Sequence, residues 1–324
     1  MTKKAVVLPL IIAMLSSCGN NISTDFKVIT PSGAPALAFY DQGSNLNLTI
    51  DSTPTNVAAE LQKNDYDMIV FDSINGLKSL KRNSNSTYAL ARILTGGNFF
   101  LVAINKEVNQ ETGKVPMPTK DDVIVSFGEK LIPDLVYSKL ASDYWHIDNK
   151  PTYLNSVSDT RAVLSSGKQG GKNVDYVFTA EPILTTIMNK QDAETYGKIS
   201  IVANVRNDWK SLTGQNAIAQ AGLFVKKELL ETRKDDLDSY IDSLDERLYN
   251  AVNDINVVKA ELDNYGTLTE QATRFGFNSN IISAVQKDKA NKIGIVTKDE
   301  KVDVNEFLTS LGQETFSEEY FINL

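Results

Sequence analysis

The chain has 324 residues, of which 42% are hydrophobic and 23% are charged, and its formal net charge at pH 7 is −8. This length predicts about two structural units, and the moderate charge is typical of a folded protein rather than a disordered one. The acidic balance argues against nucleic acid as a partner and against electrostatic docking on anionic lipid. Because the chain has a single cysteine, no disulfide can form within it, and its stability must come from the hydrophobic core.

The N-terminal residues have the pattern of a lipoprotein signal peptide. Lys3 and Lys4 precede an uncharged apolar run over residues 5–15, which is too short to span a bilayer. The run ends in Leu-Ser-Ser-Cys at residues 15–18, which is typical of a lipobox, whose cysteine is acylated before cleavage. The alternative is a plain secretory signal with a chance cysteine. We predict a signal peptide over residues 1–17, lipidation at Cys18 and a flexible tether over residues 18–25.

Short apolar runs then alternate with amphipathic helical patterns. We expect strands at residues 26–30, 46–50, 67–71, 88–94, 99–104, 123–126, 152–154, 174–178, 199–203 and 222–225. We expect helices at residues 34–40, 55–63, 74–81, 131–143, 159–165 and 182–189. This alternation predicts mostly parallel sheets that helices cover on both faces.

The C-terminal part is helical in pattern. Apolar residues at helical spacing over residues 226–264 predict one or two long helices with an acidic solvent face. Shorter helices are expected at residues 268–275, 281–285 and 304–311, with a short strand at residues 293–296. No apolar stretch after the predicted signal peptide is long enough to cross a membrane, so the lipid would be the only anchor, on the extracytoplasmic face of the cell membrane.

The simplest arrangement of these elements is two α/β lobes. The second lobe (residues 105–205) is inserted into the first (residues 26–104 and 206–324), and the chain crosses between them near residues 104–107 and 203–222. Loops that follow the carboxyl ends of parallel strands gather at one edge of a sheet. Two such edges that face each other form a crevice, which suits a ligand clamp that closes by hinge bending.

Several motifs follow one another in the order of a known family. After the lipobox come Pro-Ser-Gly-Ala at residues 31–34, DMIVFDS at 67–73, FLVAIN at 100–105, VIVSFGEKLIPDL at 123–135, VDYVFTAEP at 174–182 and QAGLFVKK at 220–227. Together they resemble the type II solute-binding lipoproteins of ABC importers, in the branch that handles nitrate, sulfonates, taurine and thiamine-precursor pyrimidines. The resemblance covers most of the chain from residue 26 onward. It implies a two-lobed type II periplasmic-binding-protein-like fold, a monomer, a small-molecule ligand between the lobes and an ABC permease as partner.

Candidate ligand-binding residues in the first lobe follow predicted strands. Ser32, Gly33 and Ala34 form a loop that opens a helix, and the N–H groups of Gly33 and Ala34 can face a ligand there. A capped helix start is the alternative. Asp72 and Ser73 follow a buried strand, where Asp72 either binds ligand or only caps the next helix.

Further candidates are expected at the base of the crevice and in the second lobe. Asn98 and Phe99 follow a glycine pair, where they either bind a planar ligand or form a hairpin turn. Phe127, Gly128 and Glu129 lie in the loop that contributes ligand-binding N–H groups in the family, although Glu129 stands where smaller polar residues are common.

Glu181 is the second-last residue of the VDYVFTAEP motif, where it either accepts a hydrogen bond from a ligand amine or caps a helix. Several aromatic side chains are either cleft walls or core residues: Phe39, Tyr40, Trp145, Tyr176 and Phe178.

An enzyme is the main alternative to a binding protein, in particular a small-metabolite lyase or synthase on the same fold. His146 is the only histidine, so a two-histidine metal site cannot form, and we expect no metal and no cofactor. Patterns of hydrolases, zinc proteases and P-loop proteins are absent from the sequence. An adhesin is disfavoured because residues 26–324 contain no repeats or low-complexity stalk. The acidic composition favours a neutral or cationic ligand over an anion.

Overall fold

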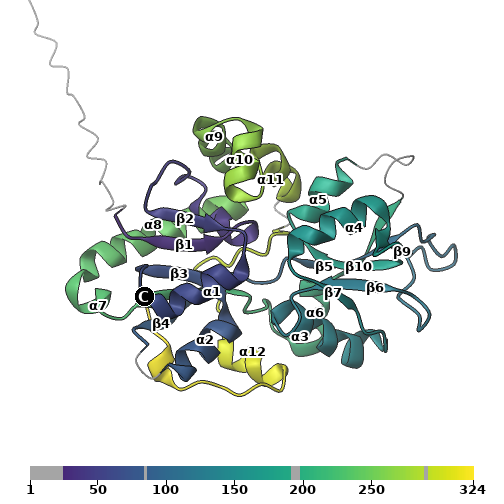
Figure 1. Ribbon diagram of the computed structural model, residues 1–324, viewed down its shortest axis with the longest axis horizontal. Coiled ribbons are helices and arrows are strands. Elements are labelled where there is room, and N and C mark those ends of the chain that lie inside the picture. The colour runs from purple at the N-terminus through teal and green to yellow at the C-terminus, as the bar shows by residue number, and fades with distance from the viewer. Residues whose placement is uncertain (1–24, 84–85, 191–197, 288–290) are drawn as a thin grey trace, which may run out of the picture.

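The computed structural model describes residues 25–83, 86–190, 198–287 and 291–324. The predicted signal peptide, the predicted lipidation site Cys18 and nearly all of the tether lie outside the described residues. Two lobes lie side by side, each built on a five-stranded sheet, and a group of helices stands over one of them (Figure 1). The predicted fold of two α/β lobes is confirmed.

The first lobe contains a mixed sheet with strand order β2-β1-β3-β12-β4. Strands β1, β2 and β3 are parallel, whereas β12 pairs antiparallel with both β3 and β4. Alternate residues of β3 face opposite layers, because Ile69 belongs to one hydrophobic cluster and Val70 to the other. The strands are β1 (Val28–Pro31), β2 (Leu48–Asp51), β3 (Met68–Asp72), β4 (Tyr88–Thr95) and β12 (Ala221–Lys226).

Helices cover both faces of this sheet. One layer contains α1 (Pro54–Lys63), α2 (Ser73–Arg82) and α12 (Val304–Ser310). The other contains the 3-10 helix η1 (Ala34–Phe39), α8 (Lys234–Asn253), α9 (Ile255–Tyr265), α10 (Leu268–Phe275) and α11 (Ser279–Val285). No helix in the described part of the chain is both long and apolar enough to cross a membrane.

The second lobe contains a mixed sheet with strand order β11-β5-β10-β6-β7. Strands β10, β6 and β7 are parallel, and β5 runs antiparallel to its neighbours β10 and β11. The strands are β5 (Phe99–Ile104), β6 (Ile124–Phe127), β7 (Thr152–Leu154), β10 (Tyr176–Ala180) and β11 (Ile199–Asn204). Its helices are α3 (Ile132–Leu140), α4 (Thr160–Ser166), α5 (Ile183–Met188) and α6 (Val205–Thr213).

Smaller elements complete the chain. A π-helical turn, η2 (Ala141–Trp145), extends α3, and a 3-10 turn, η3 (Val157–Asp159), precedes α4. Strands β8 (Lys168–Gln169) and β9 (Lys172–Asn173) form a two-stranded antiparallel hairpin. The remaining elements are α7 (Leu229–Thr232) before α8 and the 3-10 turn η5 (Glu318–Tyr320) near the C-terminus.

Two predictions about these elements are wrong, and one is confirmed. Strand β5 belongs to the second sheet, so the chain first crosses between the lobes at residues 96–98, before the predicted position near residues 104–107. The apolar pattern after β12 forms two long helices, α8 and α9, as predicted, preceded by the single turn α7. The predicted strand at residues 293–296 makes only an isolated bridge, between Ile295 and Thr95.

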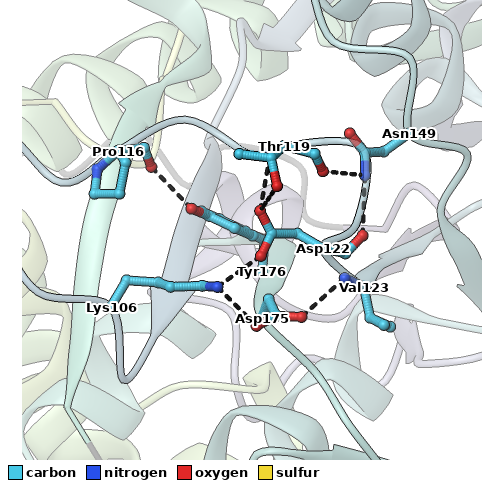
Figure 2. Close-up of polar contacts among 8 residues, drawn as sticks. All are labelled: Lys106, Pro116, Thr119, Asp122, Val123, Asn149, Asp175 and Tyr176. Carbon is cyan, nitrogen blue, oxygen red and sulfur yellow. Dashed lines mark hydrogen bonds and ion pairs between the residues drawn. The ribbon is translucent and has the colours of Figure 1, made fainter.

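A polar cluster lies at the end of the second sheet where β5 finishes and β6 and β10 begin (Figure 2). Lys106 Nζ lies 2.6 Å from Asp122 Oδ1 and 2.8 Å from Asp175 Oδ1. Asp175 Oδ2 accepts a hydrogen bond of 2.9 Å from Val123 N, and Tyr176 Oη donates one of 3.0 Å to Pro116 O. These contacts fix the starts of β6 and β10, so their carboxyl ends are held in register at the opposite edge.

The two crossings, residues 96–98 and 214–220, pack against each other without room for a side chain at Gly96. A Cβ at Gly96 would lie 2.7 Å from Ala217 Cβ and 2.9 Å from Val296 Cγ2. Backbone bonds join the same segments, since Ile218 N donates to Gly96 O over 2.9 Å. The hinge therefore consists of two closely packed chain segments rather than a loose linker.

We predict that Gly96→Ala destabilises the protein by about 1–3 kcal/mol, because the added methyl overpacks the hinge. Ala217→Gly in the same chain should restore part of the loss, since it removes the nearer of the two clashing methyls. Urea denaturation of the two single variants and the double variant measures the coupling. A Gly96→Ala variant as stable as the wild type would contradict this packing.

Candidate ligand-binding site

A cavity of about 230 Å³ lies between the lobes, where the loops at the carboxyl ends of parallel strands meet. Its first-lobe wall consists of Pro31, Ser32, Gly33, Ala34, Pro35, Ser52, Phe71, Asp72, Ala221 and Gly276. Its second-lobe wall consists of Phe127, Gly128, Leu131, Ile132, Pro133, Asn155, Ser156, Val157, Ser158, Arg161, Ala180, Glu181, Pro182 and Ile183. Asn98 and Gln220 from the crossings and Phe99 at the start of β5 complete the lining.

The structure brings most of the predicted site residues into this one cavity. Those that line it are Ser32, Gly33, Ala34, Asp72, Asn98, Phe99, Phe127, Gly128 and Glu181. Ser73 and Glu129 do not line it. Ser73 is fully buried and its hydroxyl donates to Ala219 O, while Glu129 is exposed and its carboxylate lies 3.9 Å from Lys130 Nζ.

The loop after β1 has the expected conformation, but one expected donor is already used. Gly33 has a φ of 87°, which suits glycine, and it precedes η1 as predicted. Its N–H donates to Phe275 O over 2.7 Å, so it cannot also bind a ligand. A Cβ at Gly276 would lie 2.9 Å from Gly33 N, which shows how closely the end of α10 packs on this loop. The first-lobe wall is thus braced from behind by the C-terminal helices.

Asp72 caps the helix that follows it, which was one of the two roles predicted for it. Its side chain also contacts the second lobe. Its Oδ1 accepts hydrogen bonds of 2.8 Å from Asn75 N and 3.1 Å from Asn75 Nδ2 at the start of α2. Its Oδ2 accepts a hydrogen bond of 3.1 Å from Ile132 N, the first residue of α3. Burial raises the pKa of Asp72 above its usual range, and the hydrogen bonds from Asn75 and Ile132 oppose this effect.

Asn98 and Gln220 connect the two crossings to each other and to the second lobe. Asn98 Oδ1 accepts a hydrogen bond of 2.9 Å from Gln220 Nε2, and Asn98 Nδ2 donates one of 2.6 Å to Glu181 O. Glu181 N in turn donates to Asn98 O over 2.9 Å. The predicted amide at the base of the crevice is therefore part of a continuous polar network at the hinge.

Glu181 is 4% exposed and holds the start of α5. Its Oε2 accepts a hydrogen bond of 2.9 Å from Thr185 N, and its Oε1 accepts one of 2.7 Å from Thr185 Oγ1. Burial raises the pKa of Glu181 above its usual range, although the Thr185 hydrogen bonds and the charge of Lys292 act in the opposite direction. The helix-capping interpretation of Glu181 is confirmed.

The apolar part of the cavity has an aromatic floor made of Phe71, Phe99 and Phe127. Phe99 and Phe127 pack edge-to-face with ring centroids 6.0 Å apart, and Phe178 supports both rings from below at 5.6 and 6.3 Å. None of the aromatic residues proposed as cleft walls lines the cavity. Those residues are all 9% exposed or less, so they are core residues: Phe39, Tyr40, Trp145, Tyr176 and Phe178.

Sequence reasoning missed the polar rim of the cavity. Ser52 follows β2, and Asn155, Ser156 and Ser158 follow β7, so the rule that predicted the other loops also applies to these strands. Arg161 lies in the first turn of α4 and is the only basic side chain among the lining residues. Within the described chain, Arg161 has no hydrogen bond, ion pair or ring contact. The described residues also contain no group of three or more His, Cys, Asp or Glu that could hold a metal ion.

Comparison with known proteins defines the fold. No family model and no curated protein matches the sequence. An ABC transporter protein from Parabacteroides distasonis is 18% identical over 93% of this chain and 99% of its own, with a TM-score of 0.65. The ligand-binding component of an ABC-type import system from Staphylococcus aureus, with zinc bound, is 12% identical over 92% and 96%, with a TM-score of 0.62.

The periplasmic aliphatic sulphonate binding protein SsuA from Escherichia coli is 10% identical over 89% of this chain and 85% of its own, with a TM-score of 0.59. The first two of these structural neighbours are named as parts of ABC transport or import systems, and the third is named as a sulphonate binding protein. The chain therefore has the two-lobed fold of periplasmic binding proteins, as the resemblance implied.

We predict that Glu181→Gln raises the melting temperature by about 2–4 °C at pH 8, because it removes a buried charge. The amide keeps both contacts with Thr185, since its oxygen accepts from Thr185 N and its NH₂ donates to the hydroxyl oxygen. The raised pKa of Glu181 means that its stabilising contribution is complete at low pH and is lost as pH rises through that pKa, so the gain should shrink at pH 5.5.

Glu129→Gln is the matched control, because the same charge is removed from an exposed side chain. Its melting temperature should follow that of the wild type at both pH values in differential scanning fluorimetry. A Glu181→Gln variant that is less stable than the wild type at pH 8 would show that the charge itself holds α5.

Proposed function

We propose that the protein is an extracytoplasmic solute-binding protein that captures a small organic molecule between its lobes and delivers it to an ABC permease. The observation that carries this proposal is the cavity between the lobes, which strand-end loops of both lobes border. A volume of about 230 Å³ suits a small metabolite better than a drug-sized molecule. The neighbours from ABC transport systems support the same assignment. The protein would act as a monomer.

The polar rim supports a ligand with an acidic group. Arg161 offers a guanidinium with no protein partner in the described chain, and such a group binds carboxylate, sulfonate or phosphate oxygens in pairs. The two acidic side chains in the lining, Asp72 and Glu181, already accept hydrogen bonds from protein donors on both carboxylate oxygens. We therefore propose an organic anion with an apolar body on the aromatic floor, in place of the neutral or cationic ligand that the acidic composition favours.

We predict that Arg161→Gln weakens binding of such a ligand by roughly 10- to 100-fold, the loss of one charge-assisted hydrogen-bonding group. Isothermal titration with butanesulfonate and pentanoate, beside neutral pentanamide and cationic pentylamine, separates the charge classes. Arg82→Gln is the matched control, because Arg82 is exposed and lies outside the cavity lining. Tighter binding of pentylamine than of the anions would contradict the proposed ligand class.

We further propose that a lipid on Cys18 holds the protein at the membrane, on the basis of the lipobox at residues 15–18. Acyl chains contribute about 0.8 kcal/mol per buried CH₂ group, so several chains suffice for stable attachment.

Cys18→Ala should release the protein from salt-washed membranes, as followed by immunoblot of the membrane and wash fractions. Ser17→Ala keeps a small residue before the cysteine and should leave the protein in the membrane fraction. A Cys18→Ala variant that stays in washed membranes would contradict the lipid anchor.

A further inference from the structure

One carboxylate caps helices of both lobes. Asp72, at the end of β3, accepts from Asn75 N at the start of α2 with one oxygen, over 2.8 Å. Its other oxygen accepts from Ile132 N at the start of α3 in the second lobe, over 3.1 Å. Both Asp72 and Ile132 line the cavity, so this hydrogen bond spans the cleft itself.

Helix α3 has no cap from its own lobe. Its N-cap residue, Leu131, has an apolar side chain and an extended backbone with φ −95° and ψ 177°. The second residue of the helix, Pro133, has no N–H. The first N–H groups of a helix have no partner within the helix, and the helix dipole makes them a favourable site for a negative charge. Asp72 supplies this missing partner only while the two cavity walls are close together.

Other contacts between the lobes lie at the hinge, behind it, and between α5 and α11. Asn98 bonds Gln220 and Glu181 at the crossings, and Trp209 of α6 packs on Phe307 of α12 with ring centroids 5.2 Å apart. A hydrogen bond of 3.1 Å has little tolerance, so separation of the walls breaks the bond from Ile132 to Asp72.

We propose that Asp72 is a positioning residue that latches the cleft closed, by capping α3 from the opposite lobe, before any ligand binds. The latch rests on the contact alone and does not depend on which solute the protein carries. The latch affects binding through the fraction of molecules that are closed. When the closed form is less populated, the apparent affinity falls by the same fraction. Asp72 thus acts through the position of α3 rather than as a ligand contact.

The decisive variant is Asp72→Ser, measured in the ligand-free protein. Serine is among the best N-cap residues and keeps the cap on α2, but it has no second oxygen for Ile132 N. We expect the open-to-closed ratio to rise about fivefold or more, the change that loss of one helix cap produces. Asn75→Ala is the control, because it removes only the 3.1 Å side-chain contact to the same carboxylate and leaves the interlobe bond.

Single-molecule energy transfer reports the opening. Dyes on cysteines introduced at Lys63 and Lys168, in a full chain with Cys18→Ser, mark the last residue of α1 and the start of β8, two residues after the end of α4. Both helices start near the cavity and their last residues lie away from it, so these ends move most when the hinge opens. Asp72→Ser should shift the transfer histogram to lower efficiency, while Asn75→Ala should match the wild type.

A second variant removes the donor instead of the acceptor. Ile132→Pro deletes the N–H at the first helical position, where proline is favoured, and it should open the cleft in the same way. Circular dichroism shows whether each variant is folded. A folded Asp72→Ser or Ile132→Pro variant with the wild-type histogram would overturn the latch. Because no ligand is added, this outcome is separate from a failure of the solute-binding function.

Discussion

The exchange of one antiparallel strand between the lobes is the constraint on which the rest of the structure depends. Strand β5 leaves the first lobe and pairs with β10 and β11 in the second sheet, and β12 returns to lie between β3 and β4. Each sheet is therefore completed by a strand that the other lobe delivers, and both crossings are anchored in backbone ladders. Because Phe99 and Ala221 begin these strands beside the carboxyl ends of the parallel ones, the hinge and the cavity share one edge.

This arrangement forces buried carboxylates into the cavity wall. The parallel strands β3 and β10 end at Asp72 and Ala180, and the helices that follow them need caps. Asp72 and Glu181 supply these caps, so each is buried with its oxygens bonded to protein donors and has a raised pKa. Their carboxylate oxygens are therefore already occupied by hydrogen bonds within the protein. Arg161 caps no helix. It is the charged side chain of the lining that has no protein partner in the described chain and can bind a ligand.

The sequence predicted the loops of the site better than the direction of their side chains. Carboxyl ends of parallel strands lie at one edge, so Ser32 and Asp72 could be placed from the predicted strands, and the family resemblance added Phe127 and Glu181. Glu129 could not, because positive φ angles at Gly128 (68°) and Lys130 (63°) turn the chain outward between them.

The first crossing was misplaced for a different reason. Strand β5 is buried at every position and has the composition of a strand from either sheet. Hydrophobic pattern identifies a buried strand without saying which neighbours it pairs with, and only the backbone ladder to β10 and β11 decides this. The rim residues after β7 carry no apolar pattern at all, so they were found only once the fold was known.

The two walls of the cavity differ in how they are supported. In the first lobe, Gly33 N–H is bonded to Phe275 O and the end of α10 packs on the loop, so that wall is held whether the cleft is open or closed. In the second lobe, α3 starts at Ile132 without a side-chain cap from its own lobe, and the partner of Ile132 N is Asp72 across the cleft. Closure therefore satisfies a backbone donor that opening leaves to water. The second-lobe wall is the one whose polar groups depend on the state of the hinge, and a ligand that reaches α3 must compete with Asp72 for the same end of the helix.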